Sequence, residues 1–187
     1  MKKIVLASSS PRRQKILSDI GLNFTVVSPC CDESKYPLSV EPESVEKLSL
    51  NKAKSVCITV SALVIGADTV VISEDKILGK PKDRDEAYKM LKSLSGKTHY
   101  VVTGVAIVDT ETGKEYTSHE VTYVTFNELS DLQIYDYIDN KKPYDKAGAY
   151  GIQELPDNFV RKIDGEIDNV IGLPTKILIK MLEEIMQ

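Results

Sequence analysis

Two arginines stand where the start of a helix disfavours them. Arg12 and Arg13 follow Ser10 and Pro11, which fit the N-cap and the first position of a helix. A helix N-terminus carries partial positive charge, so acidic residues are expected in this turn. Backbone N–H groups, hydroxyls and two guanidinium groups at one turn could instead bind a polyanion with several phosphate oxygens. The alternative is that both arginines point into solvent beside a helix that tolerates them.

A single carboxylate stands in the middle of the most apolar stretch of the chain. Residues 62–72 form an almost unbroken apolar run around Asp68, which is typical of a strand covered on both faces. An ionised carboxylate there is costly unless a cation, a metal or hydrogen bonds meet it. Side chains alternate along a strand, so Gly66 shares the face of Asp68 and is expected to leave the space beside it free. We therefore favour a functional role for Asp68 over a structural one.

A lysine on an apolar helix face is another candidate. Residues 42–57 carry apolar residues at helical spacing, and Lys52 falls near the middle of their stripe. Such a lysine either reaches back to the surface or is directed at an anion in a cleft, and the sequence favours neither. Ser49 and Ala53 beside it are small, which would leave room for a ligand.

A predicted hairpin brings a further lysine toward the carboxylate. Residues 73–76 have the composition of a four-residue hairpin loop. Pairing of Ile72 with Ile77 across this loop places Lys80 close to Asp68, with or without a bulge in the returning strand.

Two loops carry polar groups that could touch a ligand. Asp32 and Glu33 are adjacent acids, which are usually solvated and would gain value as metal ligands only by facing the arginine turn. Residues 145–153 combine glycines and other small residues with Gln153. This segment is either a tight connection or a place where backbone approaches a flat ligand closely and an amide reads its edge.

Composition limits the kind of partner. The chain has 187 residues, of which 42% are hydrophobic, and a formal net charge of −4. We expect one globular domain over residues 1–187. We expect no nucleic-acid partner, since binding to a phosphate backbone normally needs a basic face, so any bound phosphate should belong to a small molecule. The apolar run near the start is too short for a signal peptide or a membrane span, and we expect no membrane partner and a cytoplasmic location.

The cysteines and histidines show no pattern typical of a metal site. The three cysteines, Cys30, Cys31 and Cys57, have neither disulfide-framework nor zinc-ligand spacing. We expect them to be reduced and structural, with the alternative that Cys30 or Cys31 is simply exposed. His99 and His119 are expected to be structural or exposed.

Periodicity predicts alternating strands and helices. An opening strand–helix–strand unit precedes the elements described above, and a capping box at Asp83 and Glu86 begins the next helix. The rest of the predicted elements are strands at 99–109 and 115–126, a helix after Ser130 carrying Leu132, Tyr135 and Ile138, a hairpin of 159–163 with 168–171, and a terminal helix from 173 onward. The fold class is α/β.

The order of several short motifs is more specific than any one of them. In sequence they are Ala7-Ser8-Ser9-Ser10-Pro11-Arg12-Arg13, Asn51-Lys52-Ala53, Gly66-Ala67-Asp68-Thr69-Val70-Val71, Gly79-Lys80-Pro81, Leu94-Ser95-Gly96, Ala147-Gly148-Ala149-Tyr150-Gly151-Ile152-Gln153 and Asn169-Val170-Ile171-Gly172-Leu173-Pro174. This set spans nearly the whole chain and resembles the Maf family of nucleoside triphosphate pyrophosphatases, a family also linked to inhibition of septum formation.

The resemblance implies a fold and an activity. The fold would be similar to that of inosine triphosphatase, an elongated mixed sheet flanked by helices with a cleft between two lobes, often in a homodimer. The activity would be hydrolysis of a nucleoside triphosphate to the monophosphate and pyrophosphate with a divalent metal, Mg²⁺ or Mn²⁺. The form of residues 148–153 resembles the branch that acts on dTTP and UTP rather than the branch that acts on 7-methyl-GTP.

The resemblance also implies roles for single residues. Asp68 matches the proton acceptor, and Arg12, Thr69 and Gln153 match specificity positions. The positions that match other contacts to substrate, metal or phosphate are Ser8, Arg13, Glu33, Lys52 and Lys80.

The implied mechanism is an attack by water on the triphosphate. The cations neutralise the phosphate chain, a metal held by Glu33 and Asp68 polarises the α-phosphate, and Asp68 orients or deprotonates the water. The alternative function is a nucleotide-binding regulator of cell division with little hydrolysis. An intact Asp68 favours the enzyme, because pure binding of phosphates would do better without a buried carboxylate facing them.

Overall fold

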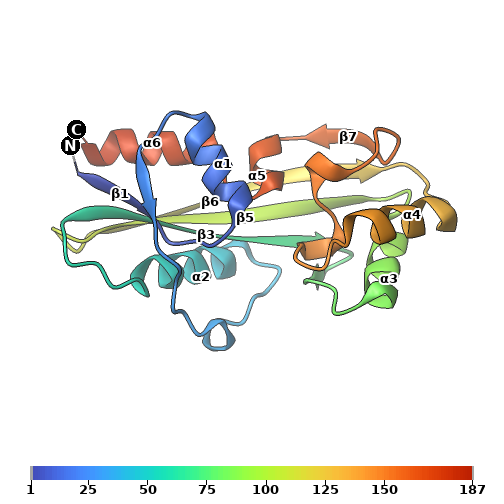
Figure 1. Cartoon of the computed structure of the whole chain (residues 1–187), viewed down its shortest axis with the longest axis horizontal. Coiled ribbons are helices and arrows are strands. Elements are labelled where there is room, and N and C mark those ends of the chain that lie inside the picture. Colours follow the sequence, from blue (N-terminus) through green and yellow to red (C-terminus); the bar gives the residue numbers. More distant parts are fainter. Residues whose placement is uncertain (1, 187) are drawn as a thin grey trace. The chain divides into compact units, whose positions relative to one another are not determined.

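The computed structural model describes residues 2–186 and shows a mixed α/β protein (Figure 1). The strands are β1 (Lys3–Leu6), β2 (Phe24–Val26), β3 (Ala62–Ser73), β4 (Lys76–Leu78), β5 (Thr98–Asp109), β6 (Glu115–Phe126) and β7 (Val160–Asp164). The helices are α1 (Pro11–Asp19), α2 (Pro42–Lys54), α3 (Arg84–Leu94), α4 (Asp131–Lys141), α5 (Ile167–Ile171) and α6 (Thr175–Met186). Short 3₁₀ turns are η1 (Glu33–Lys35), η2 (Ala147–Ala149) and η3 (Ile152–Glu154).

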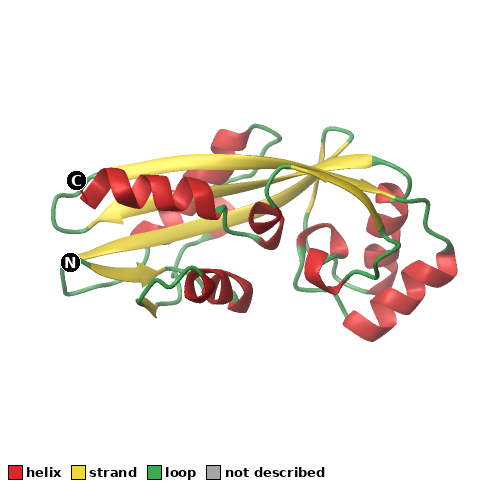
Figure 2. Cartoon of the chain, turned by 90° about the horizontal axis from the view of Figure 1, so that it is seen from above, coloured by secondary structure: helices red, strands yellow, loops and turns green. Residues whose placement is uncertain are grey.

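The strands form one seven-stranded sheet in the order β2-β1-β3-β5-β6-β7, with β4 paired to β3. The predicted mixed sheet with flanking helices is therefore confirmed. The long strands are visibly twisted along their length (Figure 2), as the stereochemistry of L-residues requires.

The chain divides into two compact units. The first contains the residues up to Thr69, Thr103–Glu120 and those from Gly172 on, and the second contains Val70–Val102 and Val121–Ile171. Each unit is described by itself below. The prediction of a single domain and the prediction of a cleft between lobes stay predictions.

The first unit is built on parallel strands. β1 pairs in parallel with β2 on one side and with β3 on the other. The connection from β1 to β2 and the connection from β2 to β3 run in opposite directions along the sheet. Because connections between parallel strands are right-handed, α1 and α2 then lie on opposite faces of the sheet (Figure 1). Pro11 begins α1 after Ser10 as the sequence predicts, and Gly21 beyond its end has a φ of +77°.

Helix α2 lies unusually close to the sheet. A side chain on Gly66 would place its Cβ 2.2 Å from the carbonyl oxygen of Ser49, and one on Gly104 would meet the backbone of Val45 at 2.7 Å. The Ser49 hydroxyl is fully buried and donates to the carbonyl oxygens of Val45 and Gly104, at 2.8 and 2.9 Å. The prediction that Gly66, Ser49 and Ala53 leave room for a ligand is wrong, because the helix backbone fills that space.

The second unit packs α3 and α4 over one apolar core. Its buried residues include Leu91, Leu94, Val124, Phe126, Ile134 and Ile138. In α4, Ile134, Tyr137 and Ile138 are buried, whereas Leu132 is 82% exposed. Tyr135 stacks on Tyr88 with the ring centroids 4.6 Å apart. Of the three residues named for this helix from the sequence, only Ile138 is therefore buried in the core.

Local signals at turns and caps are mostly confirmed. Ile72 pairs with Ile77 as predicted, but pairing continues to the next residues, so the loop is the two residues Glu74 and Asp75, both with positive φ. Ser130 and Gln133 form the complete predicted capping box of α4.

Two local predictions in the second unit need correction. Asp83 caps α3 at 2.8 Å, but the carboxylate of Glu86 accepts from the N–H of Lys82 instead of completing the box. Residues 168–171 are not a strand, because they belong to α5. Asn169 is buried there and donates to the carbonyl oxygen of Val101 and to Thr122 Oγ1, both at 3.0 Å.

No helix within residues 2–186 combines the length and apolarity needed to cross a membrane.

The contact between α2 and β3 leads to a stability prediction. Gly66→Ala should lower the free energy of unfolding by about 3 kcal/mol, the upper end of overpacking costs, because the new methyl group meets helix backbone that cannot move aside. Urea unfolding followed by circular dichroism measures this loss. Gly79→Ala is the matched control, since nothing lies within 4 Å of a Cβ there; equal losses in both variants would contradict the packing argument.

Candidate active site

One buried ammonium group joins two carboxylates in the first unit. The Nζ of Lys52 lies 2.5 Å from Asp68 Oδ1 and 3.0 Å from Glu33 Oε1. The side chains of Lys52 and Asp68 are only 10% and 14% exposed. Of the two alternatives for Lys52, the structure shows the inward one: α2 lies so close to β3 that the side chain meets Asp68 instead of reaching the surface.

The neighbouring acids Asp32 and Glu33 have different surroundings. Asp32 caps η1 by accepting from the N–H of Ser34 at 3.2 Å and from its hydroxyl at 2.6 Å. Glu33 is exposed and its carboxylate reaches Lys52. Only Glu33 therefore joins the site, as the resemblance implied.

Arg13 links the helix start to three other parts of the first unit. Its Nε donates to the carbonyl oxygen of Gly172 at 2.7 Å, and Nη2 donates to Thr69 Oγ1 at 3.0 Å. Its Nη1 lies 3.4 Å from Ser8 Oγ, a long hydrogen bond. Burial lowers the pKa of Arg13, and the nearby charge of Asp68 partly offsets this. The interpretation that both arginines point into solvent is wrong for Arg13.

The hydroxyl groups beside Arg13 are fixed by further contacts. Ser8 is buried and accepts from the N–H of Ser10 at 3.2 Å, while Thr69 Oγ1 lies 2.9 Å from Thr103 Oγ1. Arg12, the preceding residue of α1, is half-buried. The structure thus brings together Ser8, Arg13 and Thr69 as one cluster, and Glu33, Lys52 and Asp68 as another, with Asp68 and Thr69 adjacent in β3.

The other two predicted site residues belong to the second unit. Lys80 is exposed and lies two residues beyond β4, where the pairing with β3 has ended. Gln153 is exposed in η3. The predicted closeness of Lys80 to Asp68 stays a prediction.

Asp68 and Glu33 are the two carboxylates expected to hold the divalent metal. Within residues 2–186, no group of three or more His, Cys, Asp or Glu side chains is arranged to hold an ion. Asp68 and Glu33 do converge on one point, the ammonium of Lys52. Mg²⁺ is usually held by one or two carboxylates together with substrate phosphates and water. The pair therefore fits an ion that shares its coordination with a triphosphate, rather than a cage made wholly of protein groups.

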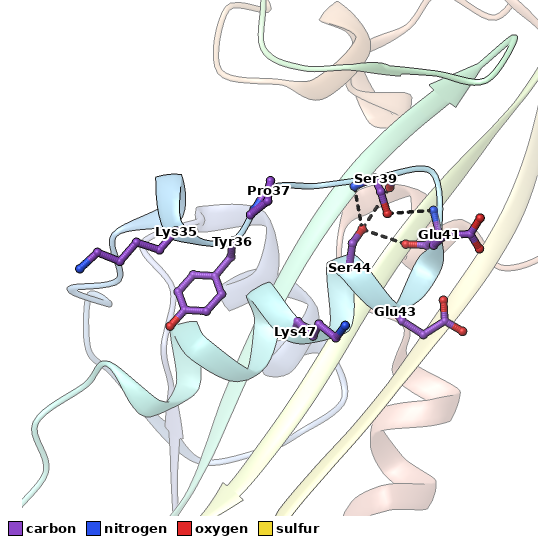
Figure 3. Close-up of a pocket in the computed structure, with 8 residues that line it drawn as sticks. All are labelled: Lys35, Tyr36, Pro37, Ser39, Glu41, Glu43, Ser44 and Lys47. Atoms are coloured by element: carbon purple, nitrogen blue, oxygen red, sulfur yellow. Dashed lines mark hydrogen bonds between the residues drawn. The ribbon is translucent and has the colours of Figure 1, made fainter.

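A groove beside η1 and the start of α2 has the volume of a ligand site but not its chemistry. It measures about 520 Å³ and is lined by Lys35, Tyr36, Pro37, Ser39, Glu41, Glu43, Ser44 and Lys47. Its two lysines point in opposite directions (Figure 3). The Ser44 hydroxyl bonds to carbonyl oxygens of its own loop. Ligand sites have polar groups that converge, so this groove is not assigned as the active site.

The exposure of the cysteines and histidines agrees with the expectation only in part. The three cysteines are free, and Cys30 is exposed, as the alternative expectation had it. Cys57 is exposed as well, so the prediction that it is structural is wrong. Burial raises the pKa of Cys31. His99 is buried, with Nε2 2.7 Å from the hydroxyl of Tyr150, and His119 Nδ1 lies 2.6 Å from Glu46.

The comparison with known proteins decides the family. The family model described as Maf-like protein matches residues 3–185. The chain belongs to the Maf family. A dTTP/UTP pyrophosphatase of Alkaliphilus oremlandii is 51% identical over 176 residues, which cover 93% of this chain and 91% of the relative. A dTTP/UTP pyrophosphatase of Thermoanaerobacter pseudethanolicus is 48% identical over 186 residues, covering 97% and 95%.

A solved structure is similar to this Maf chain over part of its length. It is a nucleoside-triphosphatase, dITP/XTP pyrophosphatase, from Mycobacterium abscessus, with a TM-score of 0.41 and 20% identity, covering 68% of this chain and 75% of that one.

The contacts of Arg13 predict that charge alone cannot replace it. Arg13→Lys should lower the free energy of unfolding by about 1–3 kcal/mol, because the buried carbonyl oxygen of Gly172 and the hydroxyl of Thr69 lose donors that a single ammonium cannot supply together. It should also weaken binding of a non-hydrolysable triphosphate analogue. Denaturant unfolding and calorimetry measure the two effects.

The control is Lys15→Ala, which removes an exposed cation paired with Asp19 on the same helix. An Arg13→Lys variant as stable as this control would show that the guanidinium contacts are not needed.

Proposed function

We propose that this Maf protein hydrolyses dTTP and UTP to the nucleoside monophosphate and pyrophosphate, and that it removes these nucleotides in the cytoplasm. The observation that carries the proposal is the similarity to relatives named dTTP/UTP pyrophosphatase. Two of them are 51% and 48% identical to this chain over 93% and 97% of its length. The meeting of Lys52, Asp68 and Glu33 supports it, because a carboxylate beside a cation is what phosphoanhydride hydrolysis needs.

In the proposed reaction, the oxygen of water attacks the α-phosphorus and Asp68 takes the proton. The bond from the α-phosphorus to the bridging oxygen breaks, and pyrophosphate leaves with that oxygen. Lys52 holds the Asp68 carboxylate in place through their ion pair and can donate to a phosphate oxygen. Glu33 and Asp68 would hold a divalent cation together with the substrate, and that cation would supply Lewis-acid polarisation of the phosphate.

The cluster around Arg13 has a second task in this proposal. Arg13 is engaged by Gly172 and Thr69, so its main contribution is to fix the hydroxyls of Ser8 and Thr69 while adding positive charge behind them. Arg12, on the same turn of α1, is assigned to the substrate on the family resemblance. Both arginines add positive charge at this helix start, which favours a polyanion.

Base selection is assigned to Gln153, with Arg12 and Thr69 as further specificity positions, on the family resemblance. The amide of Gln153 offers a donor and an acceptor, which match the O4 and N3–H edge of uracil and thymine. Cytosine presents the reverse pattern, and an amide fixed in one orientation rejects it. Lys80 is assigned to the phosphates on the same resemblance.

A nucleotide-binding regulator of cell division is the alternative function, and a homodimer is a further expectation from the family. The intact Asp68 beside Lys52 favours catalysis over binding alone. Light scattering of the purified protein would test the dimer.

The first functional prediction concerns the proton acceptor. Asp68→Asn should lower kcat by about 10²–10⁴-fold, because the amide has the same shape but cannot take the proton. Affinity for a non-hydrolysable triphosphate should persist. Pyrophosphate release and calorimetry measure the two quantities, with circular dichroism as the check on folding. Near-normal turnover would remove Asp68 from the mechanism.

The second prediction concerns the base. The wild type should show a higher kcat/KM for dTTP and UTP than for CTP, ATP and GTP, and should release pyrophosphate rather than phosphate. Gln153→Ala should flatten this preference while hydrolysis of each bound triphosphate persists. A wild type that prefers GTP or 7-methyl-GTP would place the protein in another branch.

The third prediction concerns competition between Lys52 and the metal. Without nucleotide, the ammonium already pairs with both carboxylates and offsets part of their charge, so Mn²⁺ alone should bind weakly to the wild type. Lys52→Met should bind Mn²⁺ alone at least about tenfold more tightly, since two unpaired carboxylates remain. Electron paramagnetic resonance of free Mn²⁺ measures this without any turnover.

The control for Lys52 is Lys54→Met on the same helix. This lysine is half-exposed and paired with Glu115 at 2.6 Å, so its loss should leave Mn²⁺ binding unchanged. Equal Mn²⁺ affinity in the wild type and Lys52→Met would contradict the competition.

A further inference from the structure

A buried lysine beside the base-reading segment has no role in the reaction proposed above. The side chain of Lys146 is only 8% exposed, and its Nζ lies 2.8 Å from Asp145 Oδ1 and 3.3 Å from Glu154 Oε2. A buried ammonium is costly without partners. Asp145 is its sequence neighbour and largely exposed, whereas Glu154 approaches from the far end of the segment that contains Gln153.

The stem of Lys146 also crosses the segment. A Cβ on Gly151 would lie 2.9 Å from Cε and 3.0 Å from Cδ of Lys146. Only a residue without a side chain therefore allows this crossing. The methylene groups of Lys146 thus cover Gly151, and its ammonium pairs with Glu154. This ion pair closes residues 147–153 into a loop.

Other contacts hold the first part of the same segment. The N–H of Gly148 donates to the carbonyl oxygen of Gly79 at 3.0 Å, and the N–H of Gly151 donates to the Tyr137 hydroxyl at 3.1 Å. The Tyr150 hydroxyl is bonded to His99. Gln153 comes after these anchors, in the single turn of η3, which closes with the N–H of Glu154 donating to the carbonyl oxygen of Gly151 at 2.9 Å.

We propose that Lys146 and Glu154 form a clasp that holds the η3 turn and so fixes the direction in which Gln153 presents its amide. Both are positioning residues, since they act through Gln153. The inference rests on the proposed function, in which Gln153 reads the base. A flexible Gln153 would still bind pyrimidines, but it would reorient to suit cytosine, so the clasp matters for selectivity.

The clasp predicts a specific kinetic pattern. Glu154→Gln keeps the shape of the side chain but removes the charge, and Lys146→Met keeps the stem over Gly151 but removes the ammonium. Each should lower the ratio of kcat/KM for dTTP to that for CTP by about tenfold, the scale of discrimination that modest changes in a binding site produce. The change should appear in KM, with kcat for dTTP nearly unchanged.

The double variant tests that the two residues act together. Lys146→Met/Glu154→Gln should lose no more selectivity than either single variant, because both remove the same interaction. Asp164→Asn is the control: it breaks an exposed ion pair of the same unit, with Lys162 at 2.7 Å, and should leave the ratio unchanged. Should Lys146→Met fail to fold, Glu154→Gln still decides the question, since the Glu154 side chain is 36% exposed.

The outcomes separate the two proposals. A wild type that prefers dTTP, with folded variants that keep this preference, overturns the clasp and leaves the proposed function standing. A wild type without pyrimidine preference overturns both. If the losses of selectivity in the two single variants add up in the double variant, the two residues do not act as a pair. If the variants lower kcat alone, Lys146 and Glu154 contribute to general stability and not to positioning.

Discussion

The ammonium of Lys52 between Asp68 and Glu33 is the interaction on which the first unit depends. A charge this deeply buried must be met by opposite charge at short range, and breaking a fully buried pair by removing one partner typically costs about 3–5 kcal/mol. The pair can form only if α2 lies close to β3. That approach explains why Gly66 and Gly104 lack side chains and why the Ser49 hydroxyl bonds within the interface. Packing and chemistry therefore impose the same requirement on this helix.

The start of α1 in the same unit also carries charges that are unfavourable by themselves. Two guanidinium groups in a first helical turn repel the helix dipole, which works against folding. Arg13 offsets this by donating to Gly172 and Thr69. The cost of placing cations there is thus met in part by hydrogen bonds within the protein, which hold the Arg13 guanidinium in one position.

Gly66 illustrates what the sequence could and could not predict. Strand alternation correctly placed it on the face of Asp68, but no local pattern could show that a helix, and not a ligand, occupies the space beside it. Signals carried by neighbouring residues, such as the Ser130–Gln133 cap and the pairing of Ile72 with Ile77, were predicted correctly because they depend on residues close in sequence. What packs beside a strand depends instead on distant parts of the chain.

In the candidate site, too, the residues with a local signal in the sequence could be predicted and the others could not. Lys52 and Asp68 break the apolar pattern of their elements, so each was visible without the other. Choosing Glu33 over Asp32 on physical grounds required the turn of η1, in which Asp32 caps the backbone. Lys146 was missed because a lysine in a loop looks ordinary. Its burial and its ion pair with Glu154 become visible only when the segment between them is folded.

The two units carry different kinds of polar groups. The first gathers Arg13, Lys52, Asp68 and Glu33, charged groups that suit phosphates. In the second, burial lowers the pKa of His99 to about 4 and raises that of Tyr150 above its usual range, so both are neutral near pH 7. The ammonium of Lys146 lies between the carboxylates of Asp145 and Glu154, one positive charge beside two negative ones. Uracil and thymine are uncharged near pH 7, so in the proposed function this segment would select them by the geometry of its hydrogen bonds rather than by charge.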